Sequence, residues 1–288
     1  MMLKNLMVFV ALAFGAVGVQ AEQAVTNKTE KSSSLIGKFD TAKDLFLAQF
    51  DSKTDVDDIH TIAAVATMLR HPAFAQVNYH AVAGAYGIQD GLYVPAPELF
   101  AAAFGDKWSN AHVAKDKALE EVVALVQQTL KKGGDIWIAE AGQSDFSAAM
   151  VSEIQQTLPK IDSKSRIHIV QHSEWNQDSA TPADLAFVKQ YTDYYKIPDG
   201  NATGNGTPGF RTEDATLWSR PLADKSVAQL WQVAKAIGEK YNGVEGRYDN
   251  KAVAVGGLDF SDTVEMCWIF GYNDIVDVSG FFDVFVHE

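Results

Sequence analysis

Cysteine is almost absent from this chain, which has a single Cys267 among 288 residues. One cysteine cannot form an internal disulfide, so an oxidising compartment would leave the fold without a covalent cross-link. Export to a bacterial periplasm or secretion is compatible with that. Cys267 falls on the apolar side of a predicted helix and is interpreted as a small buried hydrophobe, not a nucleophile.

Several catalytic signatures are also missing. The sequence has no Ser-His-Asp spacing of a hydrolase triad and no His/Cys spacing of a zinc site. The glycine-rich stretch 200–209 lacks the Lys-Ser/Thr ending of a phosphate-binding loop. These absences argue against triad, zinc and nucleotide-phosphate chemistry.

Positive charge is scarce, because 24 Lys and Arg face 37 Asp and Glu, for a formal net charge of −13. Such an excess of acids argues against a nucleic-acid polymer or an anionic membrane as the main partner. It is compatible with a cation site and a small or neutral substrate.

The only long apolar run lies at the N-terminus. Lys4 precedes the run Leu6–Val17, and Val19–Ala21 supplies small residues after it, which is the pattern of a cleaved secretory signal. The alternative is a membrane anchor, but the run is short for a span of about 20 residues. We expect a polar, disordered lead-in over 22–37 and one folded domain over 38–288, periplasmic or secreted and free of the membrane after cleavage.

Strand-length apolar runs alternate with amphipathic helices along this domain. The predicted strands are 45–50, 75–83, 135–139, 166–171 and 252–255, and the predicted helices are 59–71, 116–132, 146–158, 182–195, 226–241 and 262–270. This alternation predicts right-handed βαβ units and an α/β fold with a mainly parallel sheet flanked by helices. Ligands of such sheets bind at the carboxyl ends of the strands. The long loop 197–212 is either a functional lid or a disordered connector.

Four carboxylates follow the first predicted strand and precede its helix: Asp51, Asp55, Asp57 and Asp58. Acids this close repel one another, and a hard cation with oxygen ligands resolves the repulsion, with calcium the natural candidate. The helix N-terminus adds partial positive charge and free amide donors. The alternative is that one acid caps the helix and the others are solvated.

The stretch Asp51–Asp58 resembles the Asp-Thr-Asp-Pro-Gly-x-Asp-Asp motif of the inosine-uridine-preferring nucleoside hydrolases. In that family the motif follows the N-terminal strand and its acids bind calcium. This chain departs from the motif at Lys53, Thr54 and Asp55, which stand where the family has Asp, Pro and Gly.

Two further segments resemble the family in the same order along the chain. Ala81–Gly84 resembles the Thr-Val-Ala-Gly after the second strand, although Ala85 replaces an Asn that touches the sugar. Gly142–Ala148 stands where the family has Gly-Pro-Leu-Thr-Asn-Ile-Ala. The resemblance implies that Asp145 gives calcium its carbonyl or a carboxylate; the alternative is that it caps the following helix.

Glu174-Trp175-Asn176 resembles the family's Glu-Phe-Asn, in which the acid and the amide bind sugar hydroxyls and the ring packs nearby. An acid, an amide and a ring also suit a sugar pocket on chemical grounds, whereas the alternative is an ordinary polar loop. The histidines of this region, His168 and His172, are interpreted as structural.

Asp259–Glu265 resembles the family's C-terminal His-Asp-Pro-Leu segment, whose Asp completes the calcium shell. Asp262 matches that Asp, and the alternative is that it caps a helix. Ser261 takes the place of the His that protonates the departing base in some members, which leaves the leaving-group chemistry open.

The resemblance therefore implies a nucleoside hydrolase-like domain that hydrolyses N-glycosidic, ribonucleoside-like bonds with one calcium ion. The implied calcium ligands are Asp51, Asp58, Asp262 and the Asp145 carbonyl. Asp51 would also be the general base. The implied substrate-binding residues are Asp57, Glu174, Trp175 and Asn176. Alternatives are a secreted sugar- or nucleoside-binding protein with the same fold and no catalysis, and a hydrolase of another glycoside. Substrate, base preference and quaternary state, a homo-oligomer included, stay open.

Overall fold

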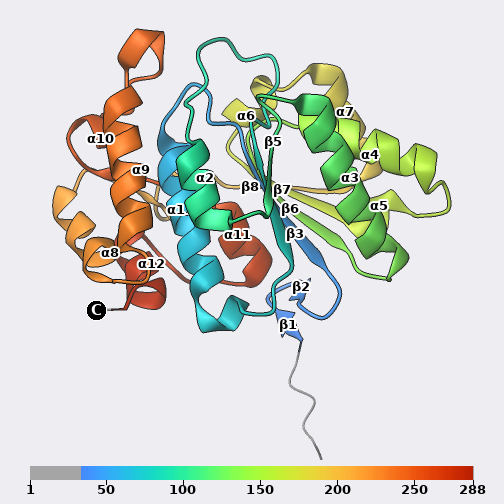
Figure 1. The fold of residues 1–288 in the computed structure, drawn as a ribbon, viewed down its shortest axis with the longest axis horizontal. Coiled ribbons are helices and arrows are strands. Elements are labelled where there is room, and N and C mark those ends of the chain that lie inside the picture. The colour runs from blue at the N-terminus through green and yellow to red at the C-terminus, as the bar shows by residue number, and fades with distance from the viewer. Residues whose placement is uncertain (1–33, 288) are drawn as a thin grey trace, which may run out of the picture. The chain divides into compact units, whose positions relative to one another are not determined.

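The computed structural model describes residues 34–287 (Figure 1). The predicted signal sequence and most of the predicted lead-in lie outside the described residues. The lead-in was expected to extend to residue 37, but β1 (Leu35–Ile36) already pairs antiparallel with β2 (Phe39–Asp40). Gly37, at φ +59°, allows the tight turn between them, and Ile36 packs against the hydrophobic core.

A six-stranded, all-parallel sheet forms the centre of the fold, with the order β5-β4-β3-β6-β7-β8. Its strands are β3 (Leu45–Phe50), β4 (Tyr79–Ala83), β5 (Trp108–Asn110), β6 (Ile136–Ala141), β7 (Ile167–His172) and β8 (Asp193–Ile197). The predicted α/β class is confirmed. A separate two-stranded antiparallel sheet pairs β9 (Arg211–Thr212) with β10 (Leu258–Asp259).

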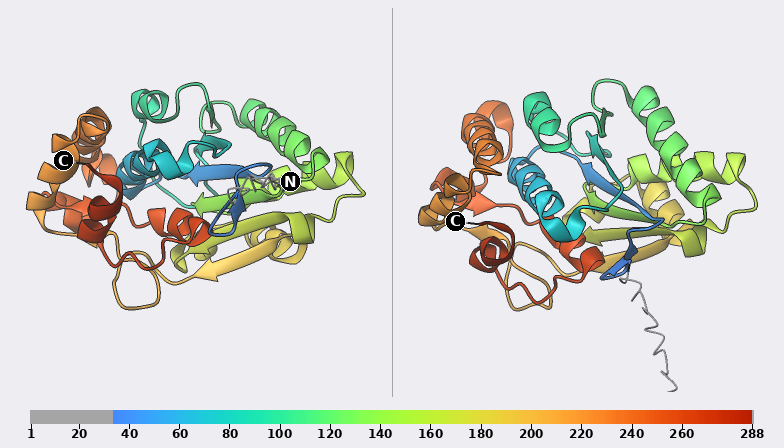
Figure 2. Two further views of the ribbon diagram at one scale, coloured as in Figure 1. Left: turned by 90° about the horizontal axis from the view of Figure 1, so that it is seen from below. Right: turned by 60° about the horizontal axis from the view of Figure 1, so that its bottom comes forward.

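Helices cover both faces of the large sheet (Figures 1 and 2). One face carries α3 (Lys115–Lys131), α4 (Asp145–Thr157), α5 (Ser163–Arg166) and α7 (Pro182–Tyr191). The other carries α1 (Asp57–Arg70), α2 (Pro97–Phe104), α9 (Ala228–Tyr241), α11 (Thr263–Phe270) and α12 (Val278–Phe285). Shorter helices are α6 (Trp175–Asp178), α8 (Ser219–Ala223), α10 (Lys251–Ala254) and the 3-10 turns Pro72–Phe74, Ala215–Trp218 and Val244–Gly246.

The residues of β3 explain why the sheet needs helices on both sides. Leu45 and Leu47 belong to one hydrophobic cluster, whereas Phe46, Ala48 and Phe50 belong to the other. Successive side chains of a strand point to opposite faces, so β3, of which every residue is buried, is covered on both. This pattern is typical of parallel sheets.

Two predicted elements are wrong. The helix predicted over 182–195 ends at Tyr191, because Thr192 is extended and the next five residues form β8 along β7. The strand predicted over 252–255 is the helix α10, whose first turn is capped by Asn250 through bonds from the amides of Ala252 and Val253.

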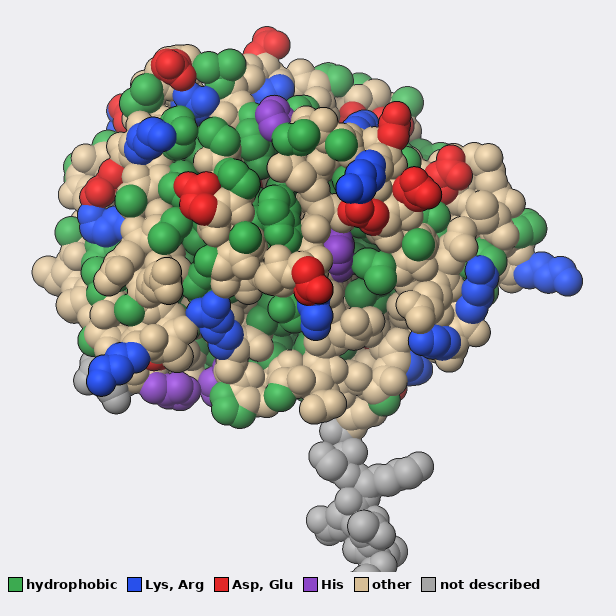
Figure 3. Space-filling view, viewed as in Figure 1, with side chains coloured by type: hydrophobic (Ala, Val, Ile, Leu, Met, Phe, Trp, Pro, Cys, Tyr) green, Lys and Arg blue, Asp and Glu red, His purple; other side chains and the backbone are tan. Residues whose placement is uncertain are grey.

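Smaller differences concern other elements. The strand predicted over 75–83 begins only at Tyr79, after the 3-10 turn Pro72–Phe74, and α2 and β5 were not predicted. Among the helices that the structure describes, none is both long enough and apolar enough to cross a membrane. Acidic and basic side chains are interspersed over the face seen in Figure 3.

Candidate functional site

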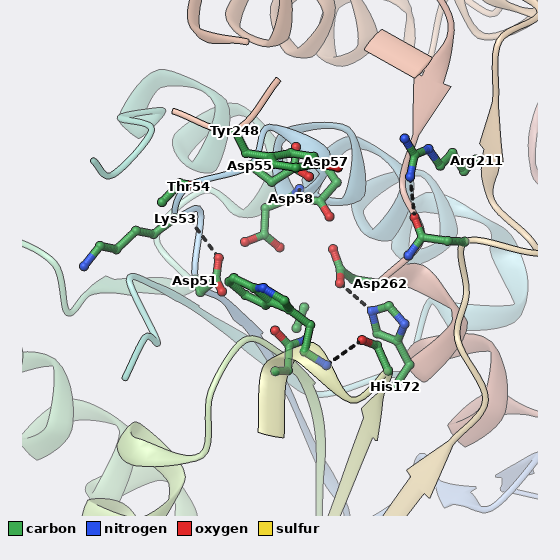
Figure 4. A pocket seen from close by; sticks show the side chains of 15 residues that line it. Asp51, Lys53, Thr54, Asp55, Asp57, Asp58, His172, Arg211, Tyr248 and Asp262 are labelled. Atoms are coloured by element: carbon green, nitrogen blue, oxygen red, sulfur yellow. Dashed lines mark hydrogen bonds and ion pairs between the residues drawn. The ribbon is translucent and has the colours of Figure 1, made fainter. Parts of the chain in front are cut away.

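A cavity of about 240 Å³ opens where β3, β6 and β7 end. Its lining includes Asp51, Asp55, Asp57, Asp58 and Asp262 (Figure 4). Parallel strands end at a shared edge, and there the fold joins the residue after β3, the first turn of α1 and the N-cap of α11. Acids separated by about two hundred positions in sequence therefore meet, as the sequence predicted.

Asp51 is held by hydrogen bonds to both carboxylate oxygens. Oδ1 accepts from the Lys53 amide at 2.8 Å, and Oδ2 accepts from Gln143 Nε2 at 2.7 Å and from Gln89 Nε2 at 3.2 Å. Burial raises the pKa of Asp51 to about 7, against the lowering effect of these bonds, and the charge of Asp262 adds to the rise. The carboxylate is fixed in place and titrates near neutral pH.

Asp58 is the least satisfied acid of the cavity. Its Oδ2 accepts from the Ser52 amide, but its Oδ1 is buried and has no hydrogen-bond partner among residues 34–287. Burial raises the pKa of Asp58 well above its usual value, and the charges of Asp262 and Asp51 raise it further. A buried carboxylate oxygen without a partner is costly, and a cation in the cavity would satisfy it.

Asp262 contacts a histidine from the end of β7. Its Oδ1 lies 2.7 Å from His172 Nε2, and its Oδ2 accepts from Thr61 Oγ1 at 3.3 Å. Burial lowers the pKa of His172, but the carboxylates of Asp199 and Asp262 outweigh that effect and raise it to about 10. The two carboxylates therefore favour the protonated imidazole, which in that form neutralises part of the acidic cluster.

The other nitrogen of the same ring faces the loop after β8. His172 Nδ1 lies 3.1 Å from the Gly200 amide and 3.6 Å from Asp199 Oδ1. In the neutral ring it accepts from the Gly200 amide, and in the charged ring it forms an ion pair with Asp199. This loop buries Phe210 and adds Asn201 and Arg211 to the cavity lining.

The donor chemistry of the cavity suits calcium, which prefers carboxylate oxygens. The unpartnered oxygen of Asp58, together with the mutual repulsion of Asp51, Asp58 and Asp262, fits a bound divalent cation. The side chains do not form a finished cage, because over residues 34–287 no group of three or more His, Cys, Asp or Glu is arranged to hold a metal ion. Calcium binding would therefore need the acids to draw closer together.

Two predicted site residues do not reach the cavity lining. Glu174 is 79% exposed and forms an ion pair with Lys196 at 2.6 Å, away from the acids. The carboxylate of Asp145 accepts from the amide and hydroxyl of Thr181, at the start of α7. Asp145 therefore ties α4 to α7, a role that the sequence did not suggest.

The other predicted substrate-binding residues do line the cavity. Asp57 is half-buried, and burial followed by the charge of Asp55 raises its pKa well above the usual value. Asn176 is buried, whereas the ring of Trp175 is 53% exposed at the rim. An unpredicted ring, Tyr248, lines the same cavity and is 51% exposed.

The Lys and Arg side chains of the cavity lining contact groups other than the proposed ligands. Lys53 points away from the acids in Figure 4, and its Nζ lies 4.5 Å from the ring centroid of Tyr86. Arg211 Nε lies 3.5 Å from Asp259 Oδ2. No local pattern marked Arg211, Asn201 or Tyr248, because each reaches the cavity only through the tertiary fold.

Comparisons with protein-family models, with curated proteins and with solved structures find no match for this chain. The resemblance to nucleoside hydrolases stays a prediction, and the function is inferred from the chemistry of the cavity.

Proposed function

We propose that this protein is a calcium-dependent hydrolase of N-glycosidic bonds in ribonucleoside-like small molecules. The observation that carries the proposal is the meeting of Asp51, Asp58 and Asp262, from three distant segments, around a cavity in which one buried Asp58 oxygen has no partner. These three residues would bind the ion. The order of the motifs along the chain supports the same assignment.

The residues of the cavity have different roles in the proposed hydrolysis. A calcium ion bound by the three acids would supply positive charge that lowers the pKa of a water ligand and anchors sugar hydroxyls. Asp51, whose carboxylate is held by the Lys53 amide and by Gln143, accepts the proton of the attacking water. Asp57 accepts hydrogen bonds from sugar hydroxyls and Asn176 donates to them, while the transition state has oxocarbenium-like character.

The aromatic rings at the rim and the absence of a proton donor for the leaving group determine which substrates we expect. Trp175 and Tyr248 offer apolar ring surface beside the polar groups, as in pockets for small cyclic ligands. Ser261 is fully buried and its hydroxyl has no partner within the described part of the chain, so it is not placed to protonate a departing base. We therefore expect substrates with good leaving groups to react fastest.

The second candidate is a sugar- or nucleoside-binding protein without catalysis. The buried Ser261 favours it, because no acid stands where the family places a proton donor. A hydrolase of another glycoside would use the same acids and rim with a different leaving group.

The deciding experiment is a ribose-release assay on the purified protein with inosine, uridine and 4-nitrophenyl riboside, in calcium or in chelator. We expect calcium-dependent release that is fastest from the nitrophenyl riboside. Asp58→Asn should abolish it, and the matched control Asp116→Asn, at an exposed position on α3, should not. Ribose binding and chelator-sensitive melting without release would support the binding protein instead. Release from the nitrophenyl riboside or from other O-glycosides, without release from inosine or uridine, would support the hydrolase of another glycoside.

A further inference from the structure

Gln143 is a fully buried side chain that joins two groups of the cavity. It lies in the loop between β6 and α4. Its Nε2 donates to Asp51 Oδ2 at 2.7 Å and to Asn176 Oδ1 at 3.1 Å. The amide nitrogen of Gln143 therefore bridges Asp51, the proposed general base, and Asn176, the proposed sugar-binding amide.

The orientation of this amide is fixed from the other side. Gln143 Oε1 accepts from the Gly87 amide at 3.0 Å and from Gln89 Nε2. Two donors at that end identify it as the oxygen, because an NH₂ group could not accept from either. The NH₂ end of Gln143 must then face Asp51 and Asn176.

This fixed amide orients Asn176 in turn. Because Asn176 Oδ1 accepts from Gln143, its own NH₂ group is the end left for other contacts. Asn176 is part of the cavity lining, so a hydrogen-bond donor is presented to a ligand there. Sugar hydroxyls accept such bonds.

The same contact orients the general base. Gln143 and Gln89 both donate to Asp51 Oδ2, whereas Oδ1 accepts from the Lys53 amide alone. A carboxylate has about four lone-pair sites. Among the contacts of the described residues, Asp51 Oδ1 therefore keeps one acceptor site, which is open to the ion or to a water.

We propose that Gln143 is a positioning residue that sets the spacing between the base Asp51 and the sugar-binding amide of Asn176. The proposal rests on the function proposed above and adds a residue to it. A misplacement of about 1 Å can cost roughly 10²-fold in rate, so loss of this link lowers turnover without removing any group that touches substrate.

The test compares Gln143→Met, which keeps the length of the side chain and removes both donors, with Gln177→Met. Gln177 is the matched control, because its Nε2 donates to Tyr194 OH on the far side of α6. For Gln143→Met we expect kcat to fall about 10- to 100-fold, ribose affinity to fall severalfold and the melting temperature to fall by several °C, because the buried partners of the amide lose their hydrogen bonds. Gln177→Met should match the wild type in all three.

A second variant tests the support of the Gln143 amide. Gln89 donates both to Asp51 Oδ2 and to Gln143 Oε1, so Gln89→Met should lower kcat and ribose affinity together, each by less than Gln143→Met does. If Gln143→Met melts far below the wild type, Gln143→Asn keeps an uncharged amide but is too short to bridge Asp51 and Asn176. The same losses in Gln143→Asn would support the proposal, and wild-type kcat and affinity would overturn it.

The readouts distinguish this proposal from the proposed function. If the wild type binds ribose but releases none from any substrate, the hydrolase assignment fails, and ribose affinity alone decides the role of Gln143. Unchanged affinity in Gln143→Met would then overturn that role, and weaker affinity would support it. A wild type that neither binds nor releases ribose would overturn both proposals.

Discussion

His172 Nε2 lies 2.7 Å from Asp262 Oδ1, and both side chains are buried in the wall of the acidic cavity. The protonated ring of His172 neutralises Asp262, one of the three acids that would bind calcium, and so replaces part of the charge of the ion. The ring and the ion therefore compete for the charge of Asp262.

This competition predicts the effect of His172→Gln. The change removes the positive charge and keeps an amide that can donate to Asp262. We expect calcium to bind about fivefold tighter or more at pH 7.5, since charges a few ångströms apart at a partly buried site interact appreciably. Calorimetric titration measures this affinity. Equal or weaker binding would show that His172 does not oppose the ion.

Asp51→Ala tests the general base. Such catalysis contributes about 10²–10⁴ in rate, and we expect turnover to fall by at least that range. The fold should persist, because the removed carboxylate is buried and its pKa is raised. Steady-state rates together with circular dichroism measure both effects. Near-normal turnover in a folded variant would remove Asp51 from the mechanism.

The raised carboxyl pKa values predict how stability depends on pH. Burial raises the pKa of Asp51 and Asp55 to about 7 and that of Asp259 to about 6, above about 3.9 for an unfolded Asp. The native state then binds more protons than the unfolded state between roughly pH 4 and 7, so stability falls as pH rises through that window. The raised pKa of His172 extends the fall to about pH 10.

Melting temperatures of calcium-stripped protein measure this dependence. We expect a loss of several °C between pH 5 and pH 8, and a much smaller loss with saturating calcium, which binds the ionised acids. Asp58→Asn should flatten the curve of the stripped protein, because it removes one of the repelling charges. A melting temperature that rises with pH in the stripped wild type would contradict this account.

The sheet was predictable because its inner strands are locally encoded. The apolar run Leu45–Phe50 predicted β3 to the residue, and the acids after it were expected at the carboxyl edge. Two elements were predicted wrongly, one because of a non-local contact and the other because of a helix cap. β8 is a strand because it pairs with β7, and α10 is a helix because Asn250 caps it.

The site was predictable to the same extent. Asp51 and Asp58 were expected at the carboxyl edge because they follow β3, whereas Asp262 reaches the cavity from the start of α11, outside the parallel sheet. Glu174 does not join them, because Lys196 on the unpredicted strand β8 pairs with it outside the cavity. Gln143 was not singled out either, since its two partners are joined only in three dimensions.

The most direct measurement is a crystal structure of the protein grown with calcium, with anomalous scattering used to locate the ion. The account predicts one calcium in the cavity, bound by oxygens of Asp51, Asp58 and Asp262 at about 2.3–2.6 Å. An empty cavity at saturating calcium, or an ion bound only elsewhere, would contradict it.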